Sequence, residues 1–334
     1  MRKFRGLKLF SGRKIILGFT LLLIVGLLMG CGSTDEVKLG IVQIVEHPSL
    51  DASREGFLDV LAENGYKEGE KLSVDYQNAQ GDQPTLQTIA NKFVADKVDL
   101  VLAIATPSAQ TMASATEEIP IMFTAVTDPV AAGLVETMEK PNTNLTGTSD
   151  LPAGDPIKEQ LKIFEEFGLN VQKVGVIFNT SEKNSEVQVE RAREVAPELG
   201  LELVEAVATN SSEVLNAAQS LIGKVDAIYV PTDNTVVSAL ESVIQVAEAE
   251  KLPLVVGEGD SVARGGLATK GIDYYTLGRK TGEMALEVIN GKEPAAMEVI
   301  RLQPEGLILN KGAAERMGVT ITEEILEKAV KVYE

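Results

Sequence analysis

The chain has 334 residues, of which 49 are acidic and 31 basic, and its net charge at neutral pH is −18. An acidic surface repels nucleic acid and anionic membrane surfaces, so we expect no nucleic-acid partner. One cysteine and one histidine exclude an intramolecular disulfide and a cysteine- or histidine-rich metal cluster, and we expect neither a metal nor a cofactor.

Residues 1–30 have the pattern of a secretory signal peptide. Six basic residues end at Lys14, and an apolar run over 15–29 follows, with the small residue Gly30 behind it. The apolar run is shorter than the about 20 residues that a spanning helix needs. The alternative is an uncleaved single-pass anchor. Cleavage leaves 25 basic and 49 acidic residues, and therefore a net charge of −24.

The lone cysteine, Cys31, directly follows Leu28, Met29 and Gly30. This arrangement resembles the lipobox of bacterial lipoproteins. The resemblance implies that the Cys31 thiol carries diacylglycerol and becomes the mature N-terminus, with residues 31–36 as a tether. Two or more acyl chains anchor a protein stably where one binds only marginally.

From residue 37 to about 147 the sequence alternates between strand and helix patterns. Short apolar runs at 38–45, 99–105 and 119–125 predict buried parallel strands. Segments 53–63 and 84–96 have apolar residues at helical spacing. Such alternation predicts a mostly parallel, doubly wound sheet.

A second alternation begins near residue 173. Strand patterns lie at 173–178, 227–230 and 252–256, and helix patterns lie at 184–199, 212–222, 234–250 and 276–290. The polar, Gly- and Pro-containing stretch 147–156 between the two runs predicts a crossover between lobes. We therefore expect an α/β fold of two doubly wound, Rossmann-like lobes joined by a hinge. The alternative is one large sheet with a long loop.

Residues 267–278, the helix pattern at 279–290 and Gly291-Lys292 resemble the return segment of the type I periplasmic-binding-protein fold. The resemblance implies that this helix packs back on the first lobe and that a last strand, at about 297–302, returns to the second. The implied lobes are 37–148 with 273–296, and 149–272 with 297–334.

Several local strings together resemble the substrate-binding lipoproteins of ABC importers for tryptophan and other aromatic amino acids. They are His47-Pro48-Ser49-Leu50-Asp51, Gly81-Asp82-Gln83, Ala105-Thr106-Pro107-Ser108-Ala109-Gln110, Thr127-Asp128-Pro129, Ser181-Glu182-Lys183-Asn184-Ser185 and Asp233-Asn234. The resemblance covers nearly the whole chain after the leader. It implies an L-amino acid as ligand, with tryptophan, phenylalanine or tyrosine first.

Ligands of open α/β sheets bind at the carboxyl ends of the strands. Thr106 and Ser108 follow a buried strand and open a helix, whose free N–H groups and hydroxyls suit a ligand carboxylate. The alternative is a plain capped helix. Thr127 adds contacts to the same carboxylate, while Asp128 either faces an ammonium group or caps a short helix.

In the second lobe, Ser181 and Asn184 either clamp a polar head group or cap a helix, and the resemblance favours the clamp. Asp233 either pairs with the ligand's α-ammonium or caps the following helix, with Asn234 beside it. Glu258 is a rival for the same ammonium.

Glu46, His47 and Pro48 end the first strand and are further candidates for contact with the ligand. His47 either lines the cleft or lies in an exposed turn. No Ser/His/Asp arrangement accompanies it at a useful spacing. The chain has no tryptophan, so an aromatic ligand must find other surfaces, such as proline and aliphatic side chains.

We expect a monomeric, non-catalytic binding protein, anchored outside the cell, that passes its ligand to an ABC permease driven by a separate ATPase. One alternative is a sensor subunit for a membrane kinase, and another is an extracellular enzyme. A different small solute, such as a nucleoside or a sugar, is an alternative ligand.

Overall fold

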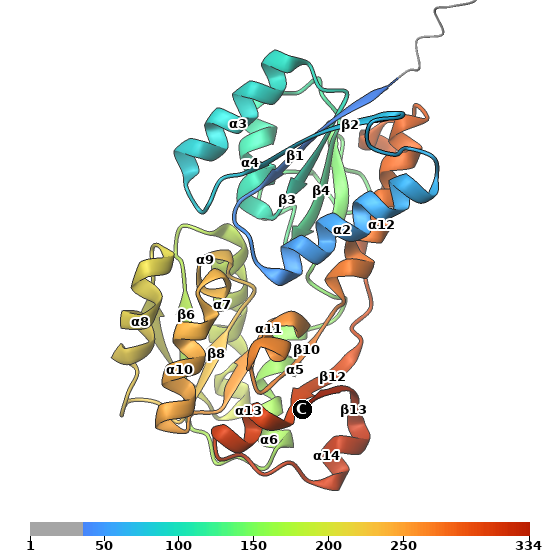
Figure 1. Ribbon diagram of the computed structural model, residues 1–334. Coiled ribbons are helices and arrows are strands. Elements are labelled where there is room, and N and C mark those ends of the chain that lie inside the picture. The colour runs from blue at the N-terminus through green and yellow to red at the C-terminus, as the bar shows by residue number, and fades with distance from the viewer. Residues whose placement is uncertain (1–35) are drawn as a thin grey trace, which may run out of the picture. The chain divides into compact units, whose positions relative to one another are not determined.

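A computed structural model describes residues 36–334 of the chain (Figure 1). The predicted signal peptide, Cys31 and residues 31–35 of the tether lie outside these described residues. Within residues 36–334, every helix is too short or too polar to traverse a bilayer.

The first lobe is built on a six-stranded parallel sheet with the order β11-β5-β4-β3-β1-β2. Its strands are β1 (Val37–Gln43), β2 (Leu72–Asn78), β3 (Leu100–Ile104), β4 (Ile121–Val126), β5 (Leu145–Ser149) and β11 (Ile300–Arg301). All residues of β3, β4 and β5 are buried, because helices cover both faces of the sheet.

Four helices cover the first sheet (Figure 1). They are α2 (Pro48–Glu63), α3 (Gln83–Asp96), α4 (Thr106–Ala115) and α12 (Tyr274–Ile289). α12 packs tightly along α2, since a Cβ on Gly278 would lie 1.8 Å from the backbone oxygen of Ser53, and one on Gly56 2.2 Å from that of Tyr275. Glycine is costly inside a helix, and here it permits this close approach. The expected return of this helix to the first lobe is confirmed.

The second lobe is built on a seven-stranded sheet with the order β13-β12-β10-β9-β8-β6-β7. The strands are parallel except for the antiparallel pair β10–β12. They are β6 (Lys173–Phe178), β7 (Glu202–Val207), β8 (Ala227–Val230), β9 (Leu254–Val256), β10 (Ala268–Gly271), β12 (Gly306–Asn310) and β13 (Ala329–Tyr333).

The α-helices of the second lobe are mostly short. They are α5 (Pro156–Leu161), α6 (Ile163–Glu166), α7 (Lys183–Val195), α8 (Val214–Ser220), α9 (Asn234–Ser238), α10 (Leu240–Glu250), α11 (Gly259–Arg264), α13 (Lys311–Arg316) and α14 (Glu323–Lys328). The single helix predicted over 234–250 is therefore wrong, because Ala239 interrupts it between α9 and α10.

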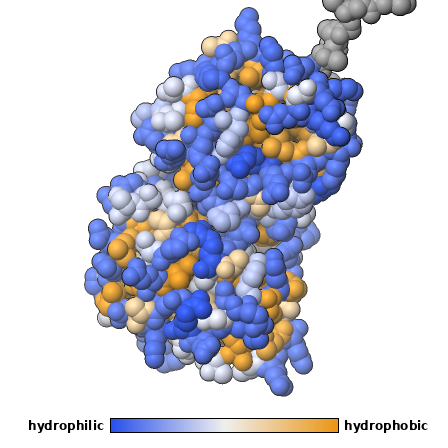
Figure 2. All heavy atoms as spheres, viewed as in Figure 1, coloured by the Kyte–Doolittle hydropathy of each residue, from blue (hydrophilic) through white to orange (hydrophobic). Residues whose placement is uncertain are grey.

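Each lobe has its own cluster of buried apolar side chains, and hydrophilic residues cover most of the face shown in Figure 2. The predicted two-lobed α/β architecture is confirmed, and the single large sheet is wrong. The predicted place of segment 297–302 is also wrong. β11 pairs with β5 in the first sheet, and Met297 and Val299 belong to the first core. The chain returns to the second lobe only after residue 302.

A chain of buried hydroxyls ties four elements of the first lobe together. Ser53 Oγ lies 2.8 Å from Thr124 Oγ1, which lies 3.2 Å from Thr148 Oγ1, which lies 2.8 Å from Thr281 Oγ1. Thr281 donates to the backbone oxygen of Leu277, and each hydroxyl has one proton to give. The donations therefore run from Ser53 towards Thr281, linking α2, β4, β5 and α12.

Candidate ligand-binding site

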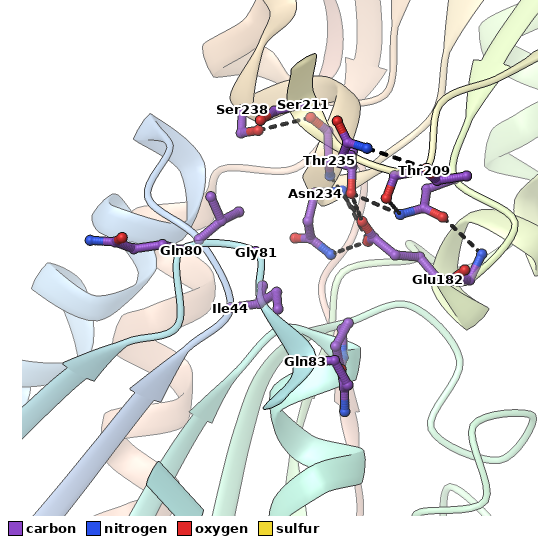
Figure 3. A pocket seen from close by; sticks show the side chains of 15 residues that line it. Ile44, Gln80, Gly81, Gln83, Glu182, Thr209, Ser211, Asn234, Thr235 and Ser238 are labelled. Atoms are coloured by element: carbon purple, nitrogen blue, oxygen red, sulfur yellow. Dashed lines mark hydrogen bonds between the residues drawn. The ribbon is translucent and has the colours of Figure 1, made fainter. Parts of the chain in front are cut away.

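Two cavities lie between the lobes, and residues of both lobes line each of them. The outer cavity, of about 290 Å³, is lined by Ile44, Val45, Gln80, Gly81, Gln83, Pro107, Asn179, Ser181, Glu182, Thr209, Asn210, Ser211, Asn234, Thr235 and Ser238 (Figure 3). The inner cavity, of about 10 Å³, is lined by His47, Leu50, Ala125, Asp150, Asn184, Thr232, Asp233, Asn234, Val237, Glu258 and Tyr274. Asn234 lines both, so the two cavities adjoin.

The inner cavity has three buried hydrogen-bond acceptors that lack a partner within residues 36–334. They are Asp150 Oδ1, Asn184 Oδ1 and, in the tautomer that carries its proton on Nε2, His47 Nδ1. A volume near 10 Å³ corresponds to about one water-sized group. The inner cavity therefore offers three acceptors to a single small donor.

Four buried hydroxyls of the first lobe also lack a partner within the described residues. One belongs to Ser49 in α2, and the other three belong to Thr106, Ser108 and Thr127. Thr106 and Ser108 flank Pro107 at the start of α4, and Thr127 directly follows β4. Thr127 lies close enough to Asp150 to lower the pKa of that carboxyl group, although Thr127 Oγ1 and Asp150 Oδ1 do not pair. Through Thr127, the set of unpartnered hydroxyls therefore lies next to the set of unpartnered acceptors.

The backbone is strained where β3 and β4 end. Ala105, the residue before α4, has φ 74° and ψ 159°, and no side chain caps that helix. Ala125, which lines the inner cavity, has φ 56°. Residues other than glycine adopt such angles at a cost of about 1–3 kcal/mol, and they cluster at ligand sites. The strain at Ala105 coincides with uncapped first-turn N–H groups of α4, beside the Thr106 and Ser108 hydroxyls.

Asp150 follows β5 and was missed in the sequence. The Tyr274 hydroxyl donates to its Oδ2 at 2.8 Å, which leaves Oδ1 facing the inner cavity. Burial raises the pKa of Asp150, while the hydrogen bond from Tyr274 and the nearby Thr127 hydroxyl work in the opposite direction. An opposite charge placed beside Oδ1 would favour the ionised carboxylate.

His47 lies in the cleft, with only 8 % of its surface exposed. Burial, followed by the positive charge of Arg264, lowers its pKa to about 3, while the Asn234 side chain works in the opposite direction. Arg264 and Asn234 belong to the second lobe, so His47 reaches across the cleft. The exposed-turn alternative is wrong, and the imidazole is neutral at physiological pH.

Asp233 and the neighbouring Glu182 accept hydrogen bonds from several segments of the second lobe. Asp233 accepts hydrogen bonds from Val236 N at 2.8 Å, Asn179 N at 2.6 Å and Ser185 Oγ at 2.6 Å. Burial, followed by the charge of Glu182, raises its pKa to about 7. Its carboxylate caps α9 and also lines the inner cavity, so its contact with a ligand stays a prediction.

The other predicted residues divide between the cleft and its surroundings. Asn234 donates both its N–H and its side-chain amide to Glu182, and Ser181 lines the outer cavity. Glu258 lines the inner cavity but caps α11 through Ser261 N.

Six predicted residues line neither cavity. Three of them are the buried Thr106, Ser108 and Thr127. Glu46 and Pro48 are exposed, and Asp128 accepts from Val130 N and Ala131 N, as expected of a cap. Sequence reasoning did not single out Tyr274 or Glu182, although Glu182 belongs to one of the strings that carry the family resemblance. Residues 36–334 contain no group of three or more His, Cys, Asp or Glu side chains arranged to hold a metal ion.

Comparison with known proteins supports a role in solute binding. Residues 38–333 match the family of ABC transporter substrate binding proteins. A tyrosine-binding protein of Clostridioides difficile is 48% identical over 279 residues, which cover 84% of this chain and 80% of that protein.

Two solved structures are similar over 89% of this chain and 99% of their own. One is a domain from Streptococcus pneumonia in complex with L-Trp, with 37% identity and a TM-score of 0.85. The other is the ligand-free, open structure of a substrate binding protein with adhesive properties from Clostridium difficile, with 45% identity and a TM-score of 0.65. The chain superposes better on the complex although its sequence is nearer to the open protein, so its lobes are arranged as in the complex.

Proteins of the matched family carry solutes outside the cytoplasm and catalyse no reaction, as expected for this chain. From its two lobes, its cleft and the match over residues 38–333, the chain belongs to the ABC transporter substrate binding proteins.

Proposed function

We propose that this protein is a lipid-anchored receptor that captures a free L-amino acid with an aromatic side chain, tyrosine or tryptophan, and delivers it to an ABC permease. The observation that carries the proposal is that three hydroxyls and three acceptors lie buried in the same cleft. None of the six has a hydrogen-bond partner within residues 36–334.

The two groups match the two charged ends of an amino acid. An ammonium group has three N–H donors, and His47 Nδ1, Asp150 Oδ1 and Asn184 Oδ1 offer three acceptors around one small cavity. A carboxylate only accepts, and Thr106, Ser108 and the first turn of α4 offer it donors. Thr127 joins the two sites, as the α-carbon joins the two charges of the ligand.

The same groups make closure depend on the ligand. Six buried groups without partners cost roughly 1–3 kcal/mol each, or about 6 kcal/mol at the lower limit. Swinging a two-state equilibrium from 1:99 to 99:1 takes about 5.5 kcal/mol. A ligand that satisfies all six therefore supplies enough differential affinity to close the lobes.

The aromatic side chain and the lipid anchor rest on other observations. Proteins similar to this chain are named for tyrosine or hold L-Trp, and the lipobox-like position of Cys31 supports the anchor. Membership of the family supports delivery to a permease.

We expect L-tyrosine and L-tryptophan to raise the melting temperature of the purified protein. Ligand at 100 times its Kd adds about 2.7 kcal/mol to the free energy of unfolding. Tyramine lacks the carboxylate and 3-(4-hydroxyphenyl)propionate lacks the ammonium group, and each should bind more than 100-fold more weakly by calorimetry. If none of the twenty amino acids shifts the melting temperature, the proposed ligand class is wrong.

Replacement of Cys31 by serine should move the protein from the membrane fraction to the medium or periplasm, because the acyl acceptor is lost while the leader remains. Immunoblots of fractionated cells measure this shift, and Ser33→Ala serves as a control in the same tether. Retention of the Cys31→Ser protein in the membrane would instead support an uncleaved anchor.

A further inference from the structure

We propose that the outer cavity receives the side chain of the ligand and selects an aromatic ring with a hydrogen-bonding edge, a phenol or an indole, over an all-carbon ring. The inference rests on the proposed function, which assigns the α-ammonium and α-carboxylate groups elsewhere.

The position of the outer cavity follows from its neighbours. Pro107 lines it and lies between Thr106 and Ser108, the residues assigned to the carboxylate, while Asn234 lines it together with the inner cavity. The α-carbon of a bound amino acid joins the ammonium and carboxylate groups. The side chain, which is the third heavy-atom substituent of the α-carbon, therefore starts at the edge of the outer cavity.

Size separates the two cavities. The inner one, at about 10 Å³, holds a group no larger than a water molecule. The outer one, at about 290 Å³, exceeds the about 150 Å³ of an engineered cavity that binds benzene. Of the two, the outer cavity has room for a phenol or an indole.

The walls of the outer cavity differ in chemistry. On the first-lobe side, Ile44, Val45 and Pro107 give an apolar floor, with Gln80 and Gln83 beside it. The second-lobe side consists of amides and hydroxyls, from Asn179, Ser181, Thr209, Asn210, Ser211, Asn234, Thr235 and Ser238. Figure 3 shows Ile44 and Gln83 on the side opposite Thr209, Asn234 and Thr235. A ring can lie on the floor with its edge towards the polar wall.

Charge in the outer cavity favours a neutral side chain. Glu182 is the one titratable residue among the fifteen that line it. Its carboxylate accepts from Thr235 N at 2.9 Å, Thr235 Oγ1 at 2.7 Å and the Asn234 amide at 2.5 Å. An acidic side chain would meet this carboxylate without a cation to offset it.

The polar wall distinguishes rings by their edges. Tyrosine and tryptophan combine an apolar face with one polar donor, and they suit a site with one apolar side and one wet side. Ser181, Thr209 and Ser211 are exposed, so water satisfies the wall when a ligand does not. Loss of the donor should therefore cost about tenfold in affinity, well below the 10⁴-fold or more seen in sealed sites.

The first test compares L-tyrosine with 4-methyl-L-phenylalanine, which has the same shape but no phenolic donor. Calorimetry on the purified protein should show at least tenfold tighter binding of tyrosine. Equal affinity of the two would overturn the inference and leave the proposed function standing. Failure of every amino acid to bind would overturn both.

The second test narrows the cavity with Val45→Phe. We expect tyrosine to bind at least tenfold more weakly and tryptophan to lose more, because it is larger, while L-alanine at millimolar concentration is unaffected. Val74→Phe places the same change at another half-buried valine of the first lobe, outside both cavities. It should leave the affinities for tyrosine, tryptophan and alanine unchanged. Equal weakening of alanine and tryptophan by Val45→Phe would contradict a side-chain slot.

Discussion

Replacement of Asp150 by asparagine should weaken amino-acid binding by about 10²–10³-fold, since truncating one partner of a buried charge pair costs about 2–5 kcal/mol. Asparagine keeps an oxygen for the Tyr274 hydroxyl, which now donates to Asp150 Oδ2 at 2.8 Å. The fold is therefore preserved, and calorimetric affinity for L-tyrosine reports the lost charge.

Asp75→Asn is the matched control for Asp150→Asn. Asp75 is a half-buried carboxylate of the edge strand β2 in the first lobe, and it forms an ion pair with Lys92. It lines neither cavity. Its replacement should leave affinity within twofold of wild type. An Asp150→Asn protein that bound tyrosine within threefold of wild type would place the ammonium group elsewhere in the cleft.

The second large effect that we expect is on pH dependence. In the closed protein, burial and the charge of Arg264 lower the pKa of His47 to about 3, whereas an exposed histidine titrates near 6.5. Because His47 must stay unprotonated in the closed form, the free energy that favours closure is fully present above pH 6.5. It decreases as the pH falls towards 3. Between pH 7.5 and 5.5 the Kd should rise about tenfold.

Other titratable groups near His47 respond differently. The pKa of Asp233 is raised to about 7 by burial and by Glu182, a residue of its own lobe, so its titration is shared by open and closed forms. Burial also raises the pKa values of Asp150 and Glu258. Protonation of Asp150 would remove the charge assigned to the ammonium group and so add to the effect of His47, whereas protonation of Glu258 would oppose it. A comparison with a variant isolates the histidine.

His47→Asn is that variant, because its side-chain oxygen can replace Nδ1 as an acceptor but does not titrate. The ratio of mutant to wild-type Kd should fall about tenfold between pH 7.5 and 5.5. A ratio that is independent of pH would show that His47 remains solvated when the ligand is bound.

The sequence predicts best those strands that are buried on both faces. β6 and β8 have the predicted bounds, and both consist almost entirely of apolar residues. β2 and β7 lie at sheet edges, where polar residues alternate with apolar ones, and β5 is rich in threonine. A continuous hydrophobic run predicts a strand only where both of its faces are buried in an apolar core. The sequence analysis therefore missed β2, β5 and β7.

The missed strand β5 explains the missed carboxylate. Asp150 and Asp233 both follow strands, but sequence reasoning recognised only the strand before Asp233. An aspartate that precedes a helix start is a cap in its own right, whereas Asp150 precedes Pro152 and no helix begins before Pro156. This difference is a local signal that could have favoured Asp150. Thr106, Ser108 and Asn184 were predictable because buried strands precede them.

The pairing of α2 with α12 has a consequence for the order in which the chain folds. α2 ends at Glu63, but the helix that packs along it begins at Tyr274, and the edge strand β11 begins at Ile300. A polypeptide that emerges N-terminus first cannot complete its leading lobe until almost all of it is available. Completion of the first lobe is thus delayed until about nine-tenths of the chain, up to Arg301, has left the ribosome.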